Sequence, residues 1–204
     1  TGTTIHLVRH GEVYNPEKIF YGRLDGFSLS DEGCDQIRRT ARWFWDQPIA
    51  AVYSSPMLRA YQSASILAAG QRQDAIIKTD LLTEVYTPYD GRPHTVMHEL
   101  GWDIYAHSEP PYEQPLDVVA RARRFLDAAR TRRPGQQIIA VTHGDILALL
   151  ALWAHGSPLH VSDSHRLQQF GFADNYPAPA AICSFHYQTA AEDEIPQVEY
   201  HRAA

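Results

Sequence analysis

The sequence has little cysteine, no long apolar run and no excess of positive charge. Its two cysteines, Cys34 and Cys183, show neither CxxC spacing nor the density of a disulfide scaffold, so we expect two buried free thiols. No apolar run reaches the length of a membrane span. The first residues lack the basic and apolar segments of a secretion signal, and we therefore expect a cytoplasmic protein.

The charge balance excludes some classes of partner. The formal net charge is −6 at pH 7, which argues against a surface that follows a nucleic-acid backbone or an anionic membrane. We expect neither as a partner. Any phosphate-binding site must be a locally basic place in an acidic protein.

Length and composition predict one globular domain over residues 1–204. The chain has 44% hydrophobic and 21% charged residues, enough to bury one sizeable core. No internal repeat or linker divides it. The sequence carries no signal for a particular oligomeric state.

Strand-like and helix-like segments alternate along the chain. Apolar, β-branched runs predict strands at 3–9, 49–55, 75–80, 136–143, 180–187 and 196–201. Amphipathic or capped segments predict helices at about 31–46, 57–69, 117–133, 144–154 and 158–169, with Ser30 and Ser55 as N-caps of the first two. This order predicts an α/β fold, a three-layer sandwich with a mostly parallel central sheet and an antiparallel strand near the end.

Residues 86–115 break this alternation. They lose clear periodicity and gather Pro, Tyr, His and Gly. We expect them to form a lid or insertion above the sheet.

Candidate functional residues stand just past the predicted strand ends. They include His10, Glu84 and His143, together with the turn that leads to Arg59. Ligands of open α/β sheets bind beyond the carboxyl ends of the strands. We therefore expect these side chains to meet at one edge.

The residue types suit phosphoryl transfer. A neutral imidazole is a nucleophile at pH 7 without losing a proton, so His10 is the predicted nucleophile. Arg9 and Arg59 can clamp phosphoryl oxygens with planar forks of donors. His143, followed at once by Gly144 and a helix, would bring a second imidazole and backbone N–H groups to the phosphate.

A carboxyl group must serve the leaving oxygen and the attacking water. One group can do both in sequence if burial raises its pKa, and Glu84 is the candidate. Asp80, Asp90 and Glu99 lie in the same region and are the alternatives.

Four segments of the chain resemble the histidine phosphatase superfamily, also called phosphoglycerate mutase-like. They are LVRHGE at 7–12, SSPMLRAYQSA at 54–64, LLTE at 81–84 and VTHGD at 141–145. The resemblance implies a phosphoglycerate mutase-like fold and a phosphohistidine intermediate on His10. It further implies that the pocket near the phosphate is lined by Asn15, Tyr21, Gly22 and Arg23.

Two histidines suggest a metal site as an alternative. His94 and His98 are four residues apart and would share a helix face, with Glu99 adjacent. The glutamate is not placed as in HExxH. We expect no metal and no organic cofactor.

These observations predict a phosphatase acting on a small-molecule phosphate monoester. The alternatives are phosphoglycerate mutase-type transfer and a non-catalytic protein that binds a phosphorylated ligand; intact RHG, Glu84 and THG count against the latter. A mutase must hold a second anionic group, which favours extra cations above the nucleophile. Between Glu84 and Asp117 the only Lys or Arg is Arg92. We therefore expect neutral or aromatic monoesters as substrates.

Overall fold

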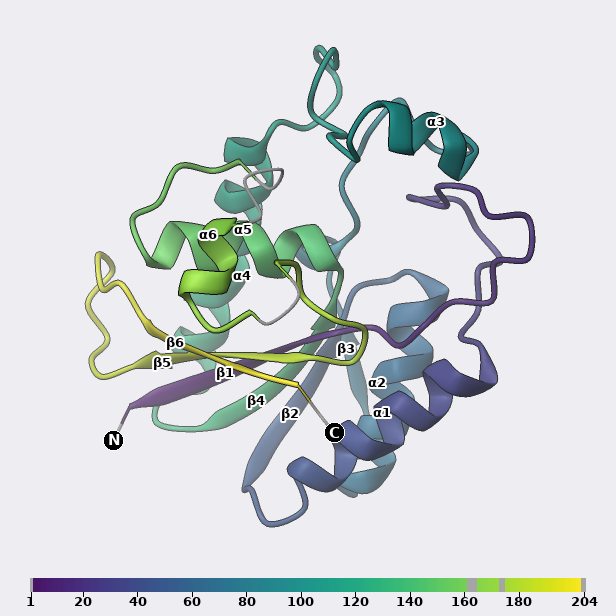
Figure 1. The fold of residues 1–204 in the computed structure, drawn as a ribbon. Coiled ribbons are helices and arrows are strands. Elements are labelled where there is room, and N and C mark those ends of the chain that lie inside the picture. The colour runs from purple at the N-terminus through teal and green to yellow at the C-terminus, as the bar shows by residue number, and fades with distance from the viewer. Residues whose placement is uncertain (1, 161–164, 173–174, 203–204) are drawn as a thin grey trace.

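A six-stranded sheet forms the centre of the protein in the computed structural model, which describes residues 2–160, 165–172 and 175–202 (Figure 1). The strands are β1 (Thr3–Arg9), β2 (Ile49–Ser54), β3 (Ile76–Lys78), β4 (Gln137–Thr142), β5 (Ile182–Tyr187) and β6 (Gln197–His201). Their order across the sheet is β3-β2-β4-β1-β5-β6. The first four of these run parallel, β5 is antiparallel to β1, and β6 is antiparallel to β5. The predicted mostly parallel sheet is confirmed.

Helices cover both faces of this sheet. They are α1 (Asp31–Trp43), α2 (Leu58–Gly70), α3 (His94–Glu99), α4 (Pro115–Arg132), α5 (Gly144–Ala154) and α6 (His165–Gln169), with a 3₁₀ turn η1 (Asp80–Leu82). Figure 1 shows α1 and α2 on one face and α4 and α5 on the other, which confirms the three-layer sandwich. Within the described part of the chain, no helix is long and apolar enough to cross a membrane.

The strand sequences explain why both faces are covered. Along β4, Ile138 and Ala140 belong to the core cluster under α4 and α5, whereas Ile139 and Val141 belong to the cluster under α1 and α2. Successive side chains of a strand point to opposite faces, so an uninterrupted apolar run buries both. The carboxyl ends of the central strands are therefore held rigidly at one edge.

The helix ends follow the sequence only in part. Ser30 caps α1 as predicted, because its side chain accepts from the backbone N–H of Gly33 at 3.0 Å. Ser55 does not cap α2. That helix begins at Leu58, with Met57 as an N-cap that offers no side-chain bond. The Ser55 hydroxyl contacts a histidine of the site described below instead.

The segment at 158–169 differs from the predicted helix, and the lid segment at 86–115 contains a helix, α3. Within the described residues, the helix predicted over 158–169 is present as α6. Residues 158–160 are not helical, and there the N–H of His160 bonds the carbonyl of Pro158, a spacing too short for a helix. Residues 161–164 lie outside the described residues. The segment predicted as a lid, residues 86–115, carries α3 and lies at the top of Figure 1. Met97 and Ile104 anchor it because both are buried in the core.

Candidate active site

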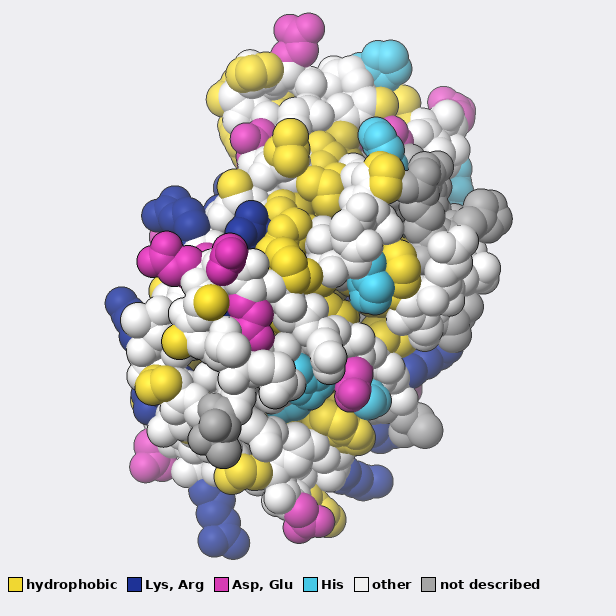
Figure 2. Space-filling view, turned by 90° about the vertical axis from the view of Figure 1, so that its left-hand side faces the viewer, with side chains coloured by type: hydrophobic (Ala, Val, Ile, Leu, Met, Phe, Trp, Pro, Cys, Tyr) yellow, Lys and Arg dark blue, Asp and Glu magenta, His cyan; other side chains and the backbone are white. Residues whose placement is uncertain are grey.

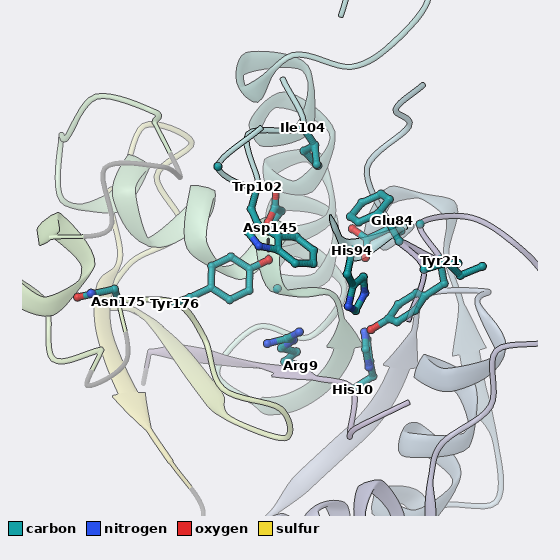
Figure 3. Close-up of a pocket in the computed structure, with 15 residues that line it drawn as sticks. Arg9, His10, Tyr21, Glu84, His94, Trp102, Ile104, Asp145, Asn175 and Tyr176 are labelled. Carbon is teal, nitrogen blue, oxygen red and sulfur yellow. Dashed lines mark hydrogen bonds between the residues drawn. The ribbon is translucent and has the colours of Figure 1, made fainter. Parts of the chain in front are cut away.

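The predicted functional side chains meet at the carboxyl ends of the central strands. His10 follows β1, His143 follows β4, Arg59 lies in the first turn of α2, and Glu84 follows η1. His10 and Glu84 line a cavity of about 560 Å³ (Figure 3), and Arg59 and His143 contact them from behind this wall. Its described lining residues are Arg9, His10, Ile19, Phe20, Tyr21, Gly22, Glu84, His94, Gly101, Trp102, Ile104, Gly144, Asp145, Asn175 and Tyr176.

His10 has the protonation state that a nucleophile needs. Its Nδ1 lies 2.8 Å from the carbonyl oxygen of Gly11, and its Nε2 accepts from Nε of Arg59 at 3.2 Å. This network assigns the proton to Nδ1 and the lone pair to Nε2. Burial, together with the charges of Arg59, His143 and Arg9, holds the pKa of His10 well below its usual range. The imidazole is therefore neutral at pH 7.

Arg59 is fully buried and lies at the centre of the group. Its Nη2 donates to the carbonyl of Gly22 at 2.7 Å and to Oε2 of Glu84 at 3.4 Å. Its guanidinium carbon lies 4.7 Å from the centre of the Tyr21 ring. The first turn of α2 thus fixes a permanent positive charge beside the Nε2 atom of His10.

Both ring nitrogens of His143 have close neighbours, and Nη2 of Arg59 lies 3.3 Å from Nδ1. Nε2 of His143 lies 2.8 Å from the Ser55 hydroxyl, and its Nδ1 lies 3.2 Å from Oε2 of Glu84. A proton on Nδ1 satisfies the carboxylate, so that Nε2 accepts from Ser55. Burial lowers the pKa of His143 to about 4, although Glu84 opposes the shift. His143 is a neutral hydrogen-bonding group at pH 7.

The expectation of a raised pKa for Glu84 is wrong for this arrangement. Burial does raise the pKa, but His143, Arg59 and the N–H of Val85 together outweigh burial and bring it well below the usual range. Oε1 accepts from that N–H at 2.9 Å. Glu84 is therefore an ionised carboxylate beside the guanidinium.

The other acids proposed for this role lie elsewhere. Asp90 accepts from the backbone N–H of Arg23 at 3.0 Å, and its pKa is raised chiefly by burial. Asp80 and Glu99 are exposed, the first in η1 and the second at the end of α3. Among these carboxylates, only Glu84 contacts Arg59 and His143 in the structure.

Arg9 lines the cavity with part of its donor capacity unused. Nη1 donates to the carbonyl of Pro177 at 2.6 Å, and the guanidinium lies 5.2 Å from the centre of the Tyr176 ring. Its Nε is buried and has no hydrogen-bond partner among the described residues. Gly144 lines the wall nearby, where a Cβ would collide with the Tyr176 hydroxyl. Both residues line the same cavity as His10, and their predicted contact with phosphate stays a prediction.

Asn15 and Arg23 lie just outside the cavity lining, whereas Tyr21 and Gly22 form part of it. The side chain of Asn15 closes its own loop, donating to the carbonyl of Ile19 at 2.8 Å. Nε of Arg23 donates to the carbonyl of Glu84 at 2.7 Å. Asn15 and Arg23 thus bond to the backbone of two lining residues, Ile19 and Glu84. Their predicted contact with phosphate stays a prediction.

Sequence reasoning missed Glu113, which connects the lid segment to Glu84. Its carboxylate accepts from Nη2 of Arg23 at 3.1 Å, from Nε of Arg121 at 2.5 Å and from the N–H of Tyr86 at 2.8 Å. Arg121 also donates to the carbonyl of Glu84, at 3.3 Å. Two arginines tied to one lid carboxylate thus hold the backbone of Glu84. This network depends on long-range docking, which no local pattern reveals.

Sequence reasoning also missed Asp145 as a wall residue. Its Oδ2 accepts from the Tyr105 hydroxyl at 2.7 Å and its Oδ1 from the Tyr176 hydroxyl. A signal was present in the sequence, since Asp145 directly follows His143-Gly144 in the first turn of a helix at a strand end.

One group in the described part of the chain has the spacing of metal ligands, namely His10, Glu84 and His143. Nitrogens of Arg59 lie within 3.4 Å of all three and already supply a positive charge there. His94 and His98 both lie against Trp102, with ring centres 5.0 and 5.2 Å away, and the described residues give them no third ligand. The expectation of a metal-free enzyme stays a prediction.

An α/β sandwich with two histidines, buried arginine and a carboxylate at the carboxyl edge of its sheet defines a phosphate-handling class of enzyme. The chain matches the histidine phosphatase superfamily (branch 1) over residues 5–173 and belongs to that superfamily.

Individual relatives agree with this assignment. An uncharacterised protein of Mycobacterium tuberculosis is 36% identical over 165 residues, 77% of this chain and 81% of its own. Phosphoserine phosphatase 1 of Hydrogenobacter thermophilus is 29% identical over 147 residues, 67% and 69% of the two chains. The structure of a mycobacterial glucosyl-3-phosphoglycerate phosphatase covers 100% of both chains with a TM-score of 0.79 at 20% identity, which shows the shared fold.

Proposed function

We propose that this protein is a phosphatase that hydrolyses a small phosphate monoester through a phosphohistidine formed on Nε2 of His10. The observation that carries the proposal is the position of Arg59, whose guanidinium contacts Nε2 of His10 and reaches Glu84 and His143. These are the nucleophile, the charge donor and the proton-transfer group that the reaction needs.

In the first step, the Nε2 lone pair of His10 attacks phosphorus and the bond from phosphorus to the leaving oxygen breaks. Arg59 and Arg9 hold the phosphoryl oxygens, with the ring of His143 as a further donor. Nε of Arg9 has no hydrogen-bond partner among the described residues, so Arg9 retains donor capacity. Nδ1–H continues to donate to the carbonyl of Gly11 and keeps the ring oriented.

Glu84 gives the leaving oxygen its proton. The carboxylate is ionised because Arg59 and His143 stabilise its charge. A phosphate dianion that binds these same groups removes that stabilisation and adds negative charge, and both effects raise the pKa of Glu84. Substrate binding thereby favours the protonated form of Glu84, which then donates its proton to the leaving oxygen.

The second step reverses these roles. Glu84, ionised again, takes a proton from a water molecule that attacks phosphorus, and the bond to Nε2 of His10 breaks to release inorganic phosphate. Neutral His10 is regenerated.

Charge on the lid segment favours hydrolysis over phosphoglycerate mutase-type transfer. On the face shown in Figure 2, acidic and histidine side chains stand at the top, whereas Lys and Arg side chains lie lower. Arg92 is the one Lys or Arg between Glu84 and Asp117, and it is exposed and absent from the cavity lining. An acidic lid repels the second anionic group of a mutase substrate. The name of one relative, phosphoserine phosphatase 1 of Hydrogenobacter thermophilus, supports the same choice.

The test measures two rates on one preparation, with EDTA present throughout. Phosphate release from p-nitrophenyl phosphate is expected to exceed the interconversion of 3- and 2-phosphoglycerate by a wide margin. Efficient interconversion with little free phosphate identifies a mutase and contradicts the proposal. Binding of phosphate esters without turnover identifies a non-catalytic binder. Activity that is lost in EDTA and restored by zinc or magnesium contradicts the metal-free mechanism.

A further inference from the structure

Asp145 and Tyr176 form a part of the cavity wall that the proposed hydrolysis does not use, and a second phenol, Tyr105, lies behind it. Figure 3 shows Asp145 and Tyr176 on one side of the cavity, and Tyr21 and Glu84 on the other. Asp145 is only 9% exposed. The hydroxyls of Tyr105 and Tyr176 each donate to one of its oxygens. A carboxylate is thus fixed in the wall of the cavity that also holds His10.

The two phenols orient this carboxylate without neutralising it. Burial and the charge of Asp145 raise the pKa of both hydroxyls well above the usual range, so they remain protonated donors. An ionised carboxylate offers about four acceptor positions, of which these hydroxyls use two. None of the ion pairs among the described residues includes Asp145. The carboxylate therefore keeps acceptor capacity and charge for a ligand.

Asp145 is ionised at neutral pH. Burial and the charge of Glu84 raise its pKa to about 6, while the two hydroxyls and Arg9 limit the rise. With His10 and His143 neutral, Arg9 and Arg59 stand against Glu84 and Asp145 in the free site. A phosphate dianion that engages the two arginines raises the pKa of Asp145, as it does that of Glu84, whereas a cation on the leaving group favours the ionised carboxylate.

Aromatic side chains also line this cavity. Trp102 projects into the cavity beside Tyr176, and Phe20 and Tyr21 line it as well (Figure 3). Aromatic faces with a nearby carboxylate are the surroundings that proteins use for ammonium groups, because ring quadrupoles and carboxylates both attract a cation. The same surroundings repel a carboxylate on the leaving group.

We propose that Asp145, with Trp102 and Tyr176, forms a leaving-group subsite that selects phosphate monoesters whose alcohol carries an ammonium group. This inference rests on the proposed phosphatase function and names the substrate class for that same cavity. Asp145 is its specificity-determining residue.

The test compares two esters of nearly equal size. O-Phosphoethanolamine ends in an ammonium group where n-propyl phosphate ends in a methyl group. We expect the wild-type kcat/KM for O-phosphoethanolamine to be at least about tenfold higher, which corresponds to about 1.4 kcal/mol. Asp145→Asn is expected to bring the ratio of the two values close to one. Asp74→Asn removes the same charge from an exposed turn after α2, and should leave the ratio as in wild type.

Equal kcat/KM values for the two esters in wild type, or an unchanged ratio in Asp145→Asn, overturn the subsite. Release of phosphate from p-nitrophenyl phosphate by the same preparation shows that the phosphatase proposal survives such a result. If no ester is hydrolysed, calorimetric binding to the His10→Ala variant gives the same comparison without turnover. Tighter binding of O-phosphoethanolamine then supports the subsite, and equal binding overturns it.

Discussion

Nε of Arg59 lies 3.2 Å from Nε2 of His10 and donates a hydrogen bond to it. Because a guanidinium is a donor at any physiological pH, Nε2 must be the unprotonated nitrogen of the ring. The carbonyl of Gly11 fixes the proton on the other nitrogen. One buried arginine therefore selects the nucleophilic tautomer and marks where phosphoryl charge is to be held.

Replacing Arg59 by Met keeps its length and removes its charge. We expect kcat/KM for phosphate release to fall by about 10²- to 10³-fold, the typical cost of losing one preorganised charge donor. Arg59→Lys should recover only part of this loss, since an ammonium lacks the planar fork. Circular dichroism checks that both variants are folded. Arg124→Met, at an exposed position on α4, is the control, and equal rates in the Arg59 and Arg124 variants contradict this role.

Glu84→Gln separates the two steps of the reaction. Nitrophenolate leaves without a proton, so p-nitrophenyl phosphate should give a burst of about one product per active site, followed by slow turnover because no base activates water. An alkyl phosphate, which needs the proton, should show no burst and a rate about 10²- to 10⁴-fold lower. Stopped-flow absorbance and phosphate release measure the two cases. Wild-type rates for both esters exclude Glu84 from proton transfer.

Glu113 should influence the reaction without touching the substrate. Glu113→Gln weakens its ion pairs with Arg23 and Arg121, which hold the carbonyl of Glu84. We expect kcat to fall about tenfold, as small displacements of catalytic groups cause large losses, with less change in KM. Glu109→Gln, at an exposed position of the same segment, should retain the wild-type kcat. A Glu113 variant with wild-type kcat contradicts the positioning role.

The folded protein should lose stability in mild acid. Burial lowers the pKa of His6 and of His143 to about 4, and that of His10 falls as well. Below about pH 6.5 the histidines of the unfolded chain bind protons, whereas the buried rings of the folded protein stay neutral. The free energy of unfolding therefore decreases from pH 6.5 toward 4. Asp145 acts in the opposite direction, because its raised pKa lets the folded state bind one proton between about pH 6 and 4 that the unfolded chain does not yet bind. Each net proton is worth about 1.4 kcal/mol per pH unit.

Urea unfolding at several pH values between 7 and 4.5 measures this dependence. The His10→Ala variant has one titrating ring fewer and should show a shallower slope. A stability that is flat or rises toward pH 4.5 contradicts the assignment of neutral buried histidines.

The sequence was informative where local patterns decide the structure. The apolar runs that precede His10 and His143 are central strands, and parallel strands deliver their carboxyl ends to one edge. Arg59 joins them because a residue in the first turn of a helix leans toward its N-terminus. These three side chains were therefore predictable.

Other features depend on partners far apart in the chain. The sequence around Ser55 is typical of a helix N-cap, but its hydroxyl hydrogen-bonds to the ring of His143, which follows β4. Burial alone predicts a raised pKa for Glu84. Arg59 in α2 and His143 after β4 outweigh burial and lower the pKa instead. The arginine partners of Glu113 come from the loop before α1 and from α4, and those of Asp145 from the lid and from the segment after α6. No local pattern encodes such contacts.

The most direct test of the mechanism is the identification of the phosphorylated residue. Brief incubation with ³²P-labelled substrate, followed by rapid denaturation, should leave phosphate on the protein that is labile in acid and stable in base. Mass spectrometry should place it on His10, and His10→Ala should lose both the label and turnover. A label on another residue, or near-normal turnover by the folded His10→Ala variant, contradicts the account.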